Sequence, residues 1–263
     1  MTMALKNRIA KMIIDPAFRK PAMLKFIFAL DDLTGIDLVR ALAPVKIMPA
    51  SAELFQRCFA HFVAGEEISL YCSTELAKIA PDEAARKYLL LQADEERAHL
   101  AHFRGKLEQF GLGDDKLARY VSPNFNKFRT TIERAIERGD FLGALIGNNL
   151  VVEGLAICLL EYGCKDMRAN SDEIAKFMDF VLEDERHHVR FGERRLLRMV
   201  ERDEIDAAHA EDIFGEMWGH ASKAIAEIPD VLDAMGLKPG ELTEKARGYY
   251  QGRLSNAGLS FAF

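Results

Sequence analysis

The strongest constraint on this chain is a short motif that occurs twice. One copy reads Glu96-Arg97-Ala98-His99 and the other reads Glu185-Arg186-His187-His188, so each holds a glutamate and a histidine three residues apart. Three residues are close to one helical turn, which places both side chains on the same helix face. A carboxylate and an imidazole on one face can bind a transition metal together.

Each motif follows an apolar segment that contains a further glutamate. Glu153 is the only charged residue between Asp140 and Glu161. Burying an unpaired carboxylate is costly, so Glu153 needs a partner, and a metal explains it best. Upstream of the first motif, Glu66 and Glu67 lie in the apolar run 55–76.

The spacing of the two halves is nearly equal. Glu66 and Glu96 are 30 residues apart, and Glu153 and Glu185 are 32 apart. Each interval suits a helix, a short turn and a return in the antiparallel neighbour. Two such halves match the ligand set of a di-iron or di-manganese site in a four-helix bundle. We therefore predict six metal ligands that also form the catalytic site: Glu66, Glu96, His99, Glu153, Glu185 and His188.

In the first of these segments, either Glu66 or the neighbouring Glu67 could be the metal ligand. Phe55, Phe59, Phe62 and Glu66 recur at steps of three and four, which favours Glu66 over Glu67.

Other residues of the right chemistry are predicted to lie outside the ligand set. Glu95 is assigned to the surroundings of the site or to the surface, and His102 to the surface or a neighbouring helix. His187 points about 100° away from His188 on a helix. For Asn148 and Asn149, hydrogen bonds near the site are one interpretation, and we favour helix–helix contacts.

The hydrophobic periodicity predicts an all-α chain, because no strand-like alternation is persuasive. Pro81, Pro123 and Pro239 suit first helical turns, and Ser51, Asp140 and Ser171 suit helix starts. Residues 1–49 are the least informative and hold at most short helices. The longer helices are expected over 51–79, 81–110, 123–137, 141–162, 171–200, 203–227 and 239–254.

Length, composition and charge limit the number of domains and the classes of protein to which the chain can belong. The 263 residues are 49% hydrophobic and show no linker, which predicts a single domain over 1–263 with its metal-binding core at about 50–200. A net charge of −6 argues against a nucleic-acid binder dominated by phosphate contacts. Cys72 and Cys158 are expected to be reduced core residues. Without an evident secretory signal or an uncharged run of ~18 residues, we expect a soluble cytoplasmic protein without a membrane segment.

With these motifs in place, the chain resembles the ferritin-like di-iron carboxylate superfamily. It is closer to ribonucleotide reductase small subunits and bacterial monooxygenases than to ferritin. The resemblance rests on Gly65-Glu66 and on Asp184-Glu185-Arg186-His187-His188 followed by Phe191-Gly192. It implies a ferritin-like four-helix bundle with additional flanking helices. It also implies that Asp184 hydrogen-bonds His99 and that Glu95 hydrogen-bonds His188.

At four places the chain differs from the residues that the named families carry, which limits the activities that the resemblance implies. Phe103 stands where reductase subunits carry a radical tyrosine, and Ile157 where hydrocarbon monooxygenases carry a threonine. Val181 replaces the extra histidine ligand of arylamine N-oxygenases. Ser69 and Asn148 occupy the positions of the cross-linked valine and tyrosine of related ligand-binding oxidases, so that bond cannot form here.

The expected function is dioxygen activation by two iron ions, with a Mn/Fe pair kept open. An oxidase or oxygenase of this kind needs a small-molecule substrate and an external electron donor; a homodimer stays open. Two interpretations fit the apolar residues near the motifs, an apolar or aromatic substrate and plain core packing, which accounts for most such residues in any bundle: Phe62, Leu70, Phe103, Ile157, Phe177 and Val181. The alternative is a ferritin-like protein that handles iron or consumes peroxide without an organic substrate. A structural bundle with buried ion pairs is the third interpretation.

Overall fold

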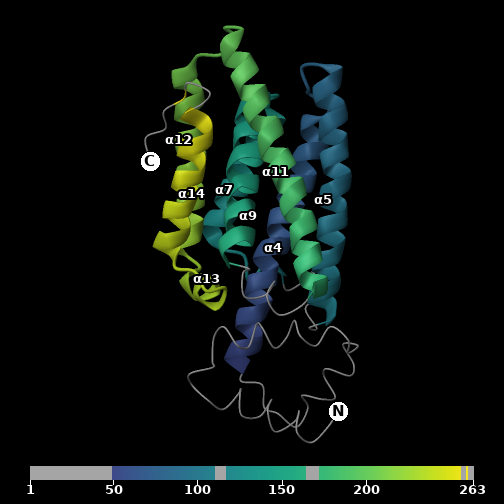
Figure 1. Cartoon of the computed structure of the whole chain (residues 1–263), viewed down its shortest axis with the longest axis vertical. Coiled ribbons are helices and arrows are strands. Elements are labelled where there is room, and N and C mark those ends of the chain that lie inside the picture. The colour runs from purple at the N-terminus through teal and green to yellow at the C-terminus, as the bar shows by residue number, and fades with distance from the viewer. Residues whose placement is uncertain (1–48, 110–116, 164–171, 256–258, 260–263) are drawn as a thin grey trace, which may run out of the picture.

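The structure, a computed structural model, describes residues 49–109, 117–163, 172–255 and 259. Every regular element in these ranges is a helix (Figure 1), which confirms the all-α prediction. The short helices expected within 1–48 and the predicted start at Ser171 lie outside the described residues.

Four long helical segments form an elongated bundle. Helix α4 packs along α5, and α11 packs along α9, so that neighbours alternate around a shared apolar core. The third segment runs without interruption through four consecutive elements. The bundle comprises α4 (Pro49–Leu76), α5 (Glu83–Gln109), the third segment α8 (Phe141–Leu145), η2 (Ile146–Val152), α9 (Glu153–Cys158) and η3 (Leu159–Gly163), and α11 (Asp172–Glu201).

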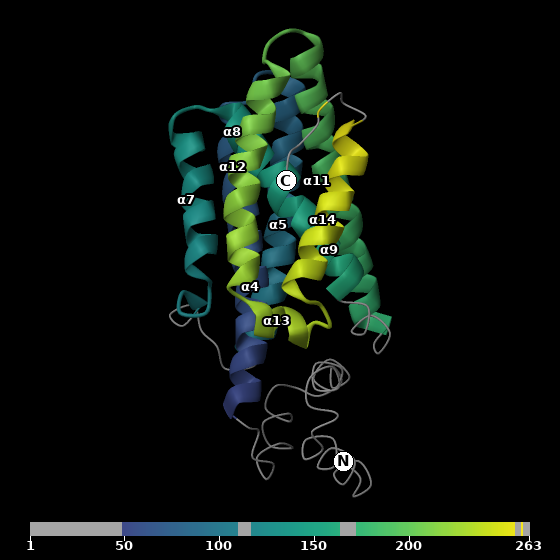
Figure 2. The same cartoon turned by 90° about the vertical axis from the view of Figure 1, so that its left-hand side faces the viewer.

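Four further helices cover one side of this bundle (Figure 2). Helix α12 contacts both α7 and η2, α14 contacts α9, and the short α13 contacts α4. We did not predict α13, a helix of one or two turns that begins at a proline. The covering helices are α7 (Pro123–Glu137), α12 (Ala207–Ala226), α13 (Pro229–Ala234) and α14 (Pro239–Leu254).

Side-chain caps fix where several helices begin. The Ser122 hydroxyl accepts the N–H of Phe125 at 3.1 Å ahead of α7, and Asp140 caps α8 in the same way. The expectation that Pro81 occupies the first turn of α5 was wrong. The Asp82 carboxylate accepts the N–H of Ala85 at 2.8 Å, so the helix begins after this capping residue.

The third bundle segment contains two π-helical stretches, η2 and η3. Directly after η2, the N–H of Glu153 donates to the carbonyl of Asn148, five residues earlier. From α14, the Tyr250 hydroxyl donates to the carbonyl of Val151 at 3.0 Å. π-Turns widen a helix and change which side chains share a face. This stretch lies against the centre of the bundle and bears on the site described below.

The same segment, Phe141–Gly163, is long and apolar enough to cross a membrane by length and composition, although we expected its polar residues to interrupt the run. Of its most apolar window, 83% is buried inside the protein. In the structure it is therefore a core helix of the bundle.

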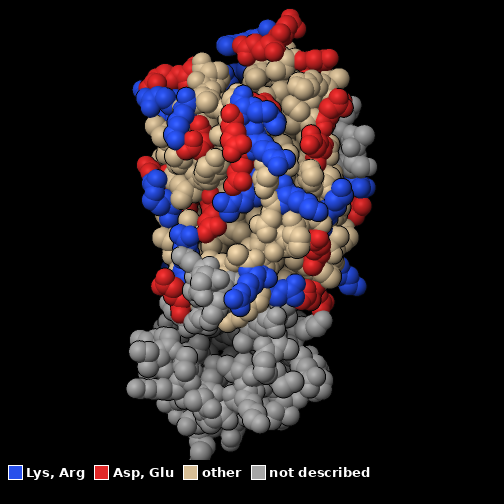
Figure 3. Space-filling model, turned by 180° about the vertical axis from the view of Figure 1, so that it is seen from behind, with Lys and Arg blue, Asp and Glu red and all other residues tan. Residues whose placement is uncertain are grey.

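Basic and acidic side chains are interspersed over the face shown in Figure 3. Ion pairs also join different segments of the chain, such as Arg195 with Asp82 and Arg253 with Glu193. Such pairs add little to stability when exposed, but they fix how neighbouring helices meet.

Candidate metal centre

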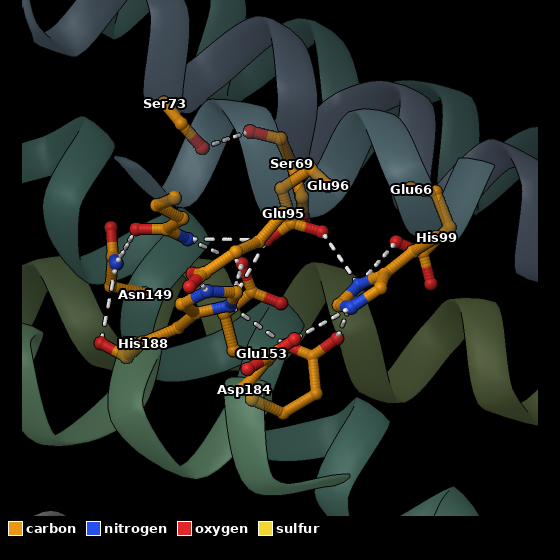
Figure 4. A network of polar contacts seen from close by, with 12 residues as sticks. Glu66, Ser69, Ser73, Glu95, Glu96, His99, Asn149, Glu153, Asp184 and His188 are labelled. Atoms are coloured by element: carbon orange, nitrogen blue, oxygen red, sulfur yellow. Dashed lines mark hydrogen bonds and ion pairs between the residues drawn. The ribbon is translucent and has the colours of Figure 1, made fainter. Parts of the chain in front are cut away.

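The structure brings all six predicted ligands to one buried point between the four bundle segments. They fall into two groups, Glu66, Glu96, His99 and Glu185, and Glu96, Glu153, Glu185 and His188, and within each group the ligand atoms lie within 4.8 Å of one another. Figure 4 shows most of these side chains converging from facing helices. Glu96 and Glu185 belong to both groups, as carboxylates that bridge two cations would.

Both imidazoles direct Nδ1 toward the centre. His99 Nδ1 lies 3.5 Å from Glu66 Oε2 and 3.5 Å from Glu96 Oε2. His188 Nδ1 lies 3.0 Å from Glu96 Oε1 and 3.2 Å from Glu185 Oε2. Each Glu-x-x-His pair therefore presents its two side chains inward from one helix turn, as the spacing predicted.

The opposite ring nitrogens turn outward to carboxylates of the neighbouring helix. His99 Nε2 lies 3.2 Å from Asp184 Oδ2, and His188 Nε2 lies 2.9 Å from Glu95 Oε2 (Figure 4). Both pairings implied by the resemblance are confirmed. A carboxylate can accept the Nε2 proton and leave the Nδ1 lone pair free for a cation.

The pKa values reflect four carboxylates and two imidazoles in one buried volume. Burial raises the pKa of Glu66 and of Glu153 well above the ordinary carboxyl value. Burial alone would raise the pKa of Glu96 too, but the adjacent His188 and His99 hold it below the usual range. Burial would lower the pKa of His99, but the closely placed carboxylates of Glu66 and Glu96 raise it to about 11.

The cluster fits two divalent cations. Its four glutamates carry four negative charges when ionised, which two divalent cations would balance. Within the described part of the chain, Glu66 Oε2, Glu96 Oε2 and His99 Nδ1 are buried without a hydrogen-bond partner. Buried polar atoms of this kind are costly unless something coordinates them. Mixed carboxylate and imidazole ligands suit iron or manganese.

The other candidate residues lie outside the two groups of clustered ligand atoms. Glu67 is paired with Arg104 at 2.6 Å, and Glu66 is the one of the two neighbours that lies in the cluster. His102 stacks on Phe177 of α11 with ring centroids 3.5 Å apart, and His187 is exposed.

No family model and no curated protein matches the chain. Several solved structures do match the chain. A protein from Synechococcus with aldehyde deformylating oxidase activity matches with a TM-score of 0.67 and 20% identity, over 79% of this chain and 91% of that one. A variant of an R2-like ligand-binding oxidase with an aerobically reconstituted Mn/Fe cofactor matches with a TM-score of 0.65 and 18% identity, over 80% and 82%. A second variant, reconstituted anaerobically, gives 0.66 and 17%, over 91% and 94%.

The chain has the ferritin-like di-metal carboxylate fold. The predicted ferritin-like four-helix bundle with additional flanking helices is thereby confirmed. At these identities the likeness extends no further than that.

A hydrogen-bonded group of amide side chains surrounds Glu153, and the sequence reasoning missed one member, Gln92. Gln92 Nε2 donates to Glu153 Oε1 at 2.9 Å, and Asn149 Nδ2 donates to Gln92 Oε1 at 2.8 Å. Asn148 Nδ2 donates to Glu153 Oε1 at 3.3 Å. For Asn148 the favoured helix–helix interpretation was wrong. The available signal for Gln92 was its position four residues before Glu96, one turn earlier on α5.

A largely apolar cavity of about 130 Å³ lies beside the cluster. Glu66, Glu153 and Glu185 line it at the side of the cluster. The rest of its wall comes from α4, α7, α9 and the covering helices α12 to α14, including Phe125, Phe128, Leu155, Ile225, Val231 and Leu232.

Only one of the six apolar residues proposed from the sequence as a substrate wall, Phe62, lines this cavity. Phe103 instead stacks on Phe62 at 5.2 Å between ring centroids, and Phe177 packs edge-on against Phe103. These rings belong to the bundle core behind the cavity. The periodicity identified inward-facing residues, but it could not separate core packing from a cavity wall.

Proposed function

We propose that the six clustered residues hold two cations, both iron or manganese with iron, and that the protein is an oxidase or oxygenase. Its substrates would be dioxygen and a small apolar or aromatic compound. The observation that carries the proposal is the apolar cavity, because three of the four clustered carboxyl groups form part of its wall. A compound in this cavity would lie next to the cations.

The clustered residues and the residues of the apolar wall would have different roles. The four glutamates would supply negative charge and oxygen donors, and the two histidines would supply nitrogen donors on rings oriented by Asp184 and Glu95. When bound, the two cations supply electrons for the reduction of dioxygen. The apolar wall keeps water away from the reacting atoms, which strengthens electrostatic interactions there.

The size of the cavity limits the substrate. Its volume of about 130 Å³ is close to the roughly 150 Å³ of an engineered apolar cavity that binds benzene. One aromatic ring or a short aliphatic chain therefore fits. Insertion of one oxygen atom into a C–H bond of such a compound consumes dioxygen, two electrons and two protons and forms water. An external electron donor is therefore part of the proposal.

The cavity lies close to the surface. Ser122 and Ile228 line both the cavity and an outer hollow that also involves Arg57, Arg119 and Glu227. This shared wall is the route that we propose for substrate access. It is formed by the start of α7 and the α12–α13 connection, outside the four-helix core.

The ligand set is tested by removing one carboxylate and comparing it with a neighbouring control. Glu153→Ala should lower the metal content to about one ion per chain or less and leave the helical content unchanged. Glu67→Ala removes a glutamate that is paired with Arg104, so it should keep two ions. Metal analysis that finds two full-occupancy ions in Glu153→Ala would remove this residue from the ligand set.

The activity is tested by mixing the anaerobic, ferrous-loaded protein with dioxygen in a stopped-flow spectrometer. An oxygenase should form a transient absorption that decays faster when a compound of one class is added, with an oxidised product detected afterwards. Continued uptake and oxidation of iron beyond two ions per chain, without any effect of added compounds, would instead establish the iron-handling alternative. Glu153→Ala serves as the control without an intact site.

A further inference from the structure

On the N-terminal side of Glu66, helix α4 contributes a polar residue to the cavity wall, His61, and one of its ring nitrogens has no hydrogen-bond partner among the described residues. His61, Gly65 and Ser69 all line the cavity at successive helical turns of α4. His61 precedes the clustered Glu66 by five residues, a rise of about 7.5 Å along the helix axis. This is roughly the length of one aromatic ring with a substituent.

The contacts of His61, which lines the cavity, fix which of its ring nitrogens carries the proton and which carries the lone pair. Its Nδ1 lies 2.7 Å from the backbone carbonyl oxygen of Arg57. Because a carbonyl only accepts, Nδ1 must carry the proton in this bond. The Arg57 side chain itself is paired with Asp230.

Burial lowers the pKa of His61, which favours the neutral imidazole. In that tautomer Nε2 is an acceptor. Nε2 is buried and has no hydrogen-bond partner among the residues that the structure describes. Phe125 packs edge-on to the ring at 6.5 Å and holds its orientation. An apolar cavity that ends on an unpaired buried acceptor favours a ligand with a donor at that end.

We propose that His61 Nε2 accepts a hydrogen bond from a hydroxyl or amino group of the substrate. The substrate class is then a small, mainly apolar compound, one aromatic ring in size, with a single hydrogen-bond donor. Its donor lies at His61 and its opposite end faces Glu66, Glu153 and Glu185. This inference rests on the proposed function, because it assigns the orientation of the compound in the same cavity.

His61 is a binding residue in this proposal. A buried acceptor left without a donor is unfavourable, so the cavity should discriminate against compounds that fit but lack a donor. Phenol and toluene are suitable probes, because they have nearly the same shape and differ in a hydroxyl against a methyl group.

The experiment measures dissociation constants of phenol and toluene for the full-length protein loaded anaerobically with Mn²⁺. His61→Leu should reduce the preference for phenol over toluene by roughly three- to tenfold, the effect of one hydrogen bond. His61→Gln, whose amide oxygen can accept the same bond, should restore most of the preference. His209→Leu is the matched control, because His209 is exposed on α12 and does not line the cavity.

Two outcomes would overturn the inference in different ways. If both probes bind and their affinity ratio is the same in His61→Leu as in the unaltered protein, His61 is not the anchor, and the cavity proposal stands. If neither probe binds, the cavity assignment fails and the inference fails with it.

A measurement on the unaltered protein does not depend on the folding of a variant. The ¹⁵N shift of His61 Nε2 should change on binding phenol and much less on binding toluene, and equal shifts would also contradict the assignment.

Discussion

The cavity leads to a specific prediction about stability for Gly65, which lies in the middle of α4 and lines the cavity wall. A Cβ built at this position meets no heavy atom within 4 Å. Replacing a helical glycine by alanine gains about 0.8–1 kcal/mol of helix propensity. Burying the added methyl group contributes up to about 0.8 kcal/mol more. Gly65→Ala should therefore stabilise the protein by about 1–2 kcal/mol, the sum of the two gains.

Gly219 is the matched control. It lies inside α12, its Cβ would also meet nothing within 4 Å, and it does not line the cavity. Gly219→Ala should gain about 1 kcal/mol from propensity alone. For a domain of this size each kcal/mol raises the melting temperature by about 2–4 °C. Thermal and denaturant unfolding measure both gains.

A larger side chain at the same position should separate stability from binding. Leucine at position 65 would place four carbon atoms in a cavity of about 130 Å³ and exclude a ring from it. Gly65→Leu should weaken toluene binding at least about tenfold, or about 1.4 kcal/mol, whereas Gly219→Leu should leave binding unchanged. Calorimetry on the Mn²⁺-loaded proteins measures this difference. Unchanged toluene affinity in Gly65→Leu, or clear destabilisation of Gly65→Ala, would show that the space beside Gly65 is not a ligand cavity.

Three further outcomes follow from the close contacts of the site. Gly192→Ala would place Cβ 2.8 Å from Cβ of Asn149, so it should push α11 away from η2 and cost about 1–3 kcal/mol in denaturant unfolding. Asp184→Asn removes a carboxylate partner of a clustered histidine and should weaken Mn²⁺ binding about 10- to 100-fold in competition with a chelator. Because the pKa of His99 is about 11 without a cation, its imidazole is protonated at pH 7 and a cation must displace that proton. Loading with Mn²⁺ should therefore release at least one proton per chain in a weakly buffered titration, and the affinity should fall as the pH is lowered.

The sequence predicted the cluster well because its signals are local. A Glu-x-x-His pair needs only one helix turn to place both side chains together, and Glu153 stands out as a lone charge in an apolar run. Helix α7 has the predicted ends, Pro123 and Glu137, because Ser122 caps it and a proline occupies its first turn. These features require no knowledge of how distant segments meet.

Other features could not be predicted because they depend on geometry that residue spacing does not encode. Asn148 and Glu153 are five residues apart, which on an α-helix turns their side chains to different faces. The π-turn between them brings both to the site, where they form a hydrogen bond. The sequence analysis did not single out His61, because its unpaired nitrogen becomes meaningful only once the cavity around it is known.

The cluster and the cavity draw on partly different elements of the chain, and this has a consequence for specificity. The six clustered residues come from the four bundle segments, whereas Phe125, Ile225 and Val231 of the cavity wall come from covering helices that hold none of them. Substitutions on α7, α12 or α13 can therefore change the shape of the cavity without moving a candidate metal ligand. We expect such substitutions to change which compound fits the cavity, while the clustered residues and His61 on α4 stay in place.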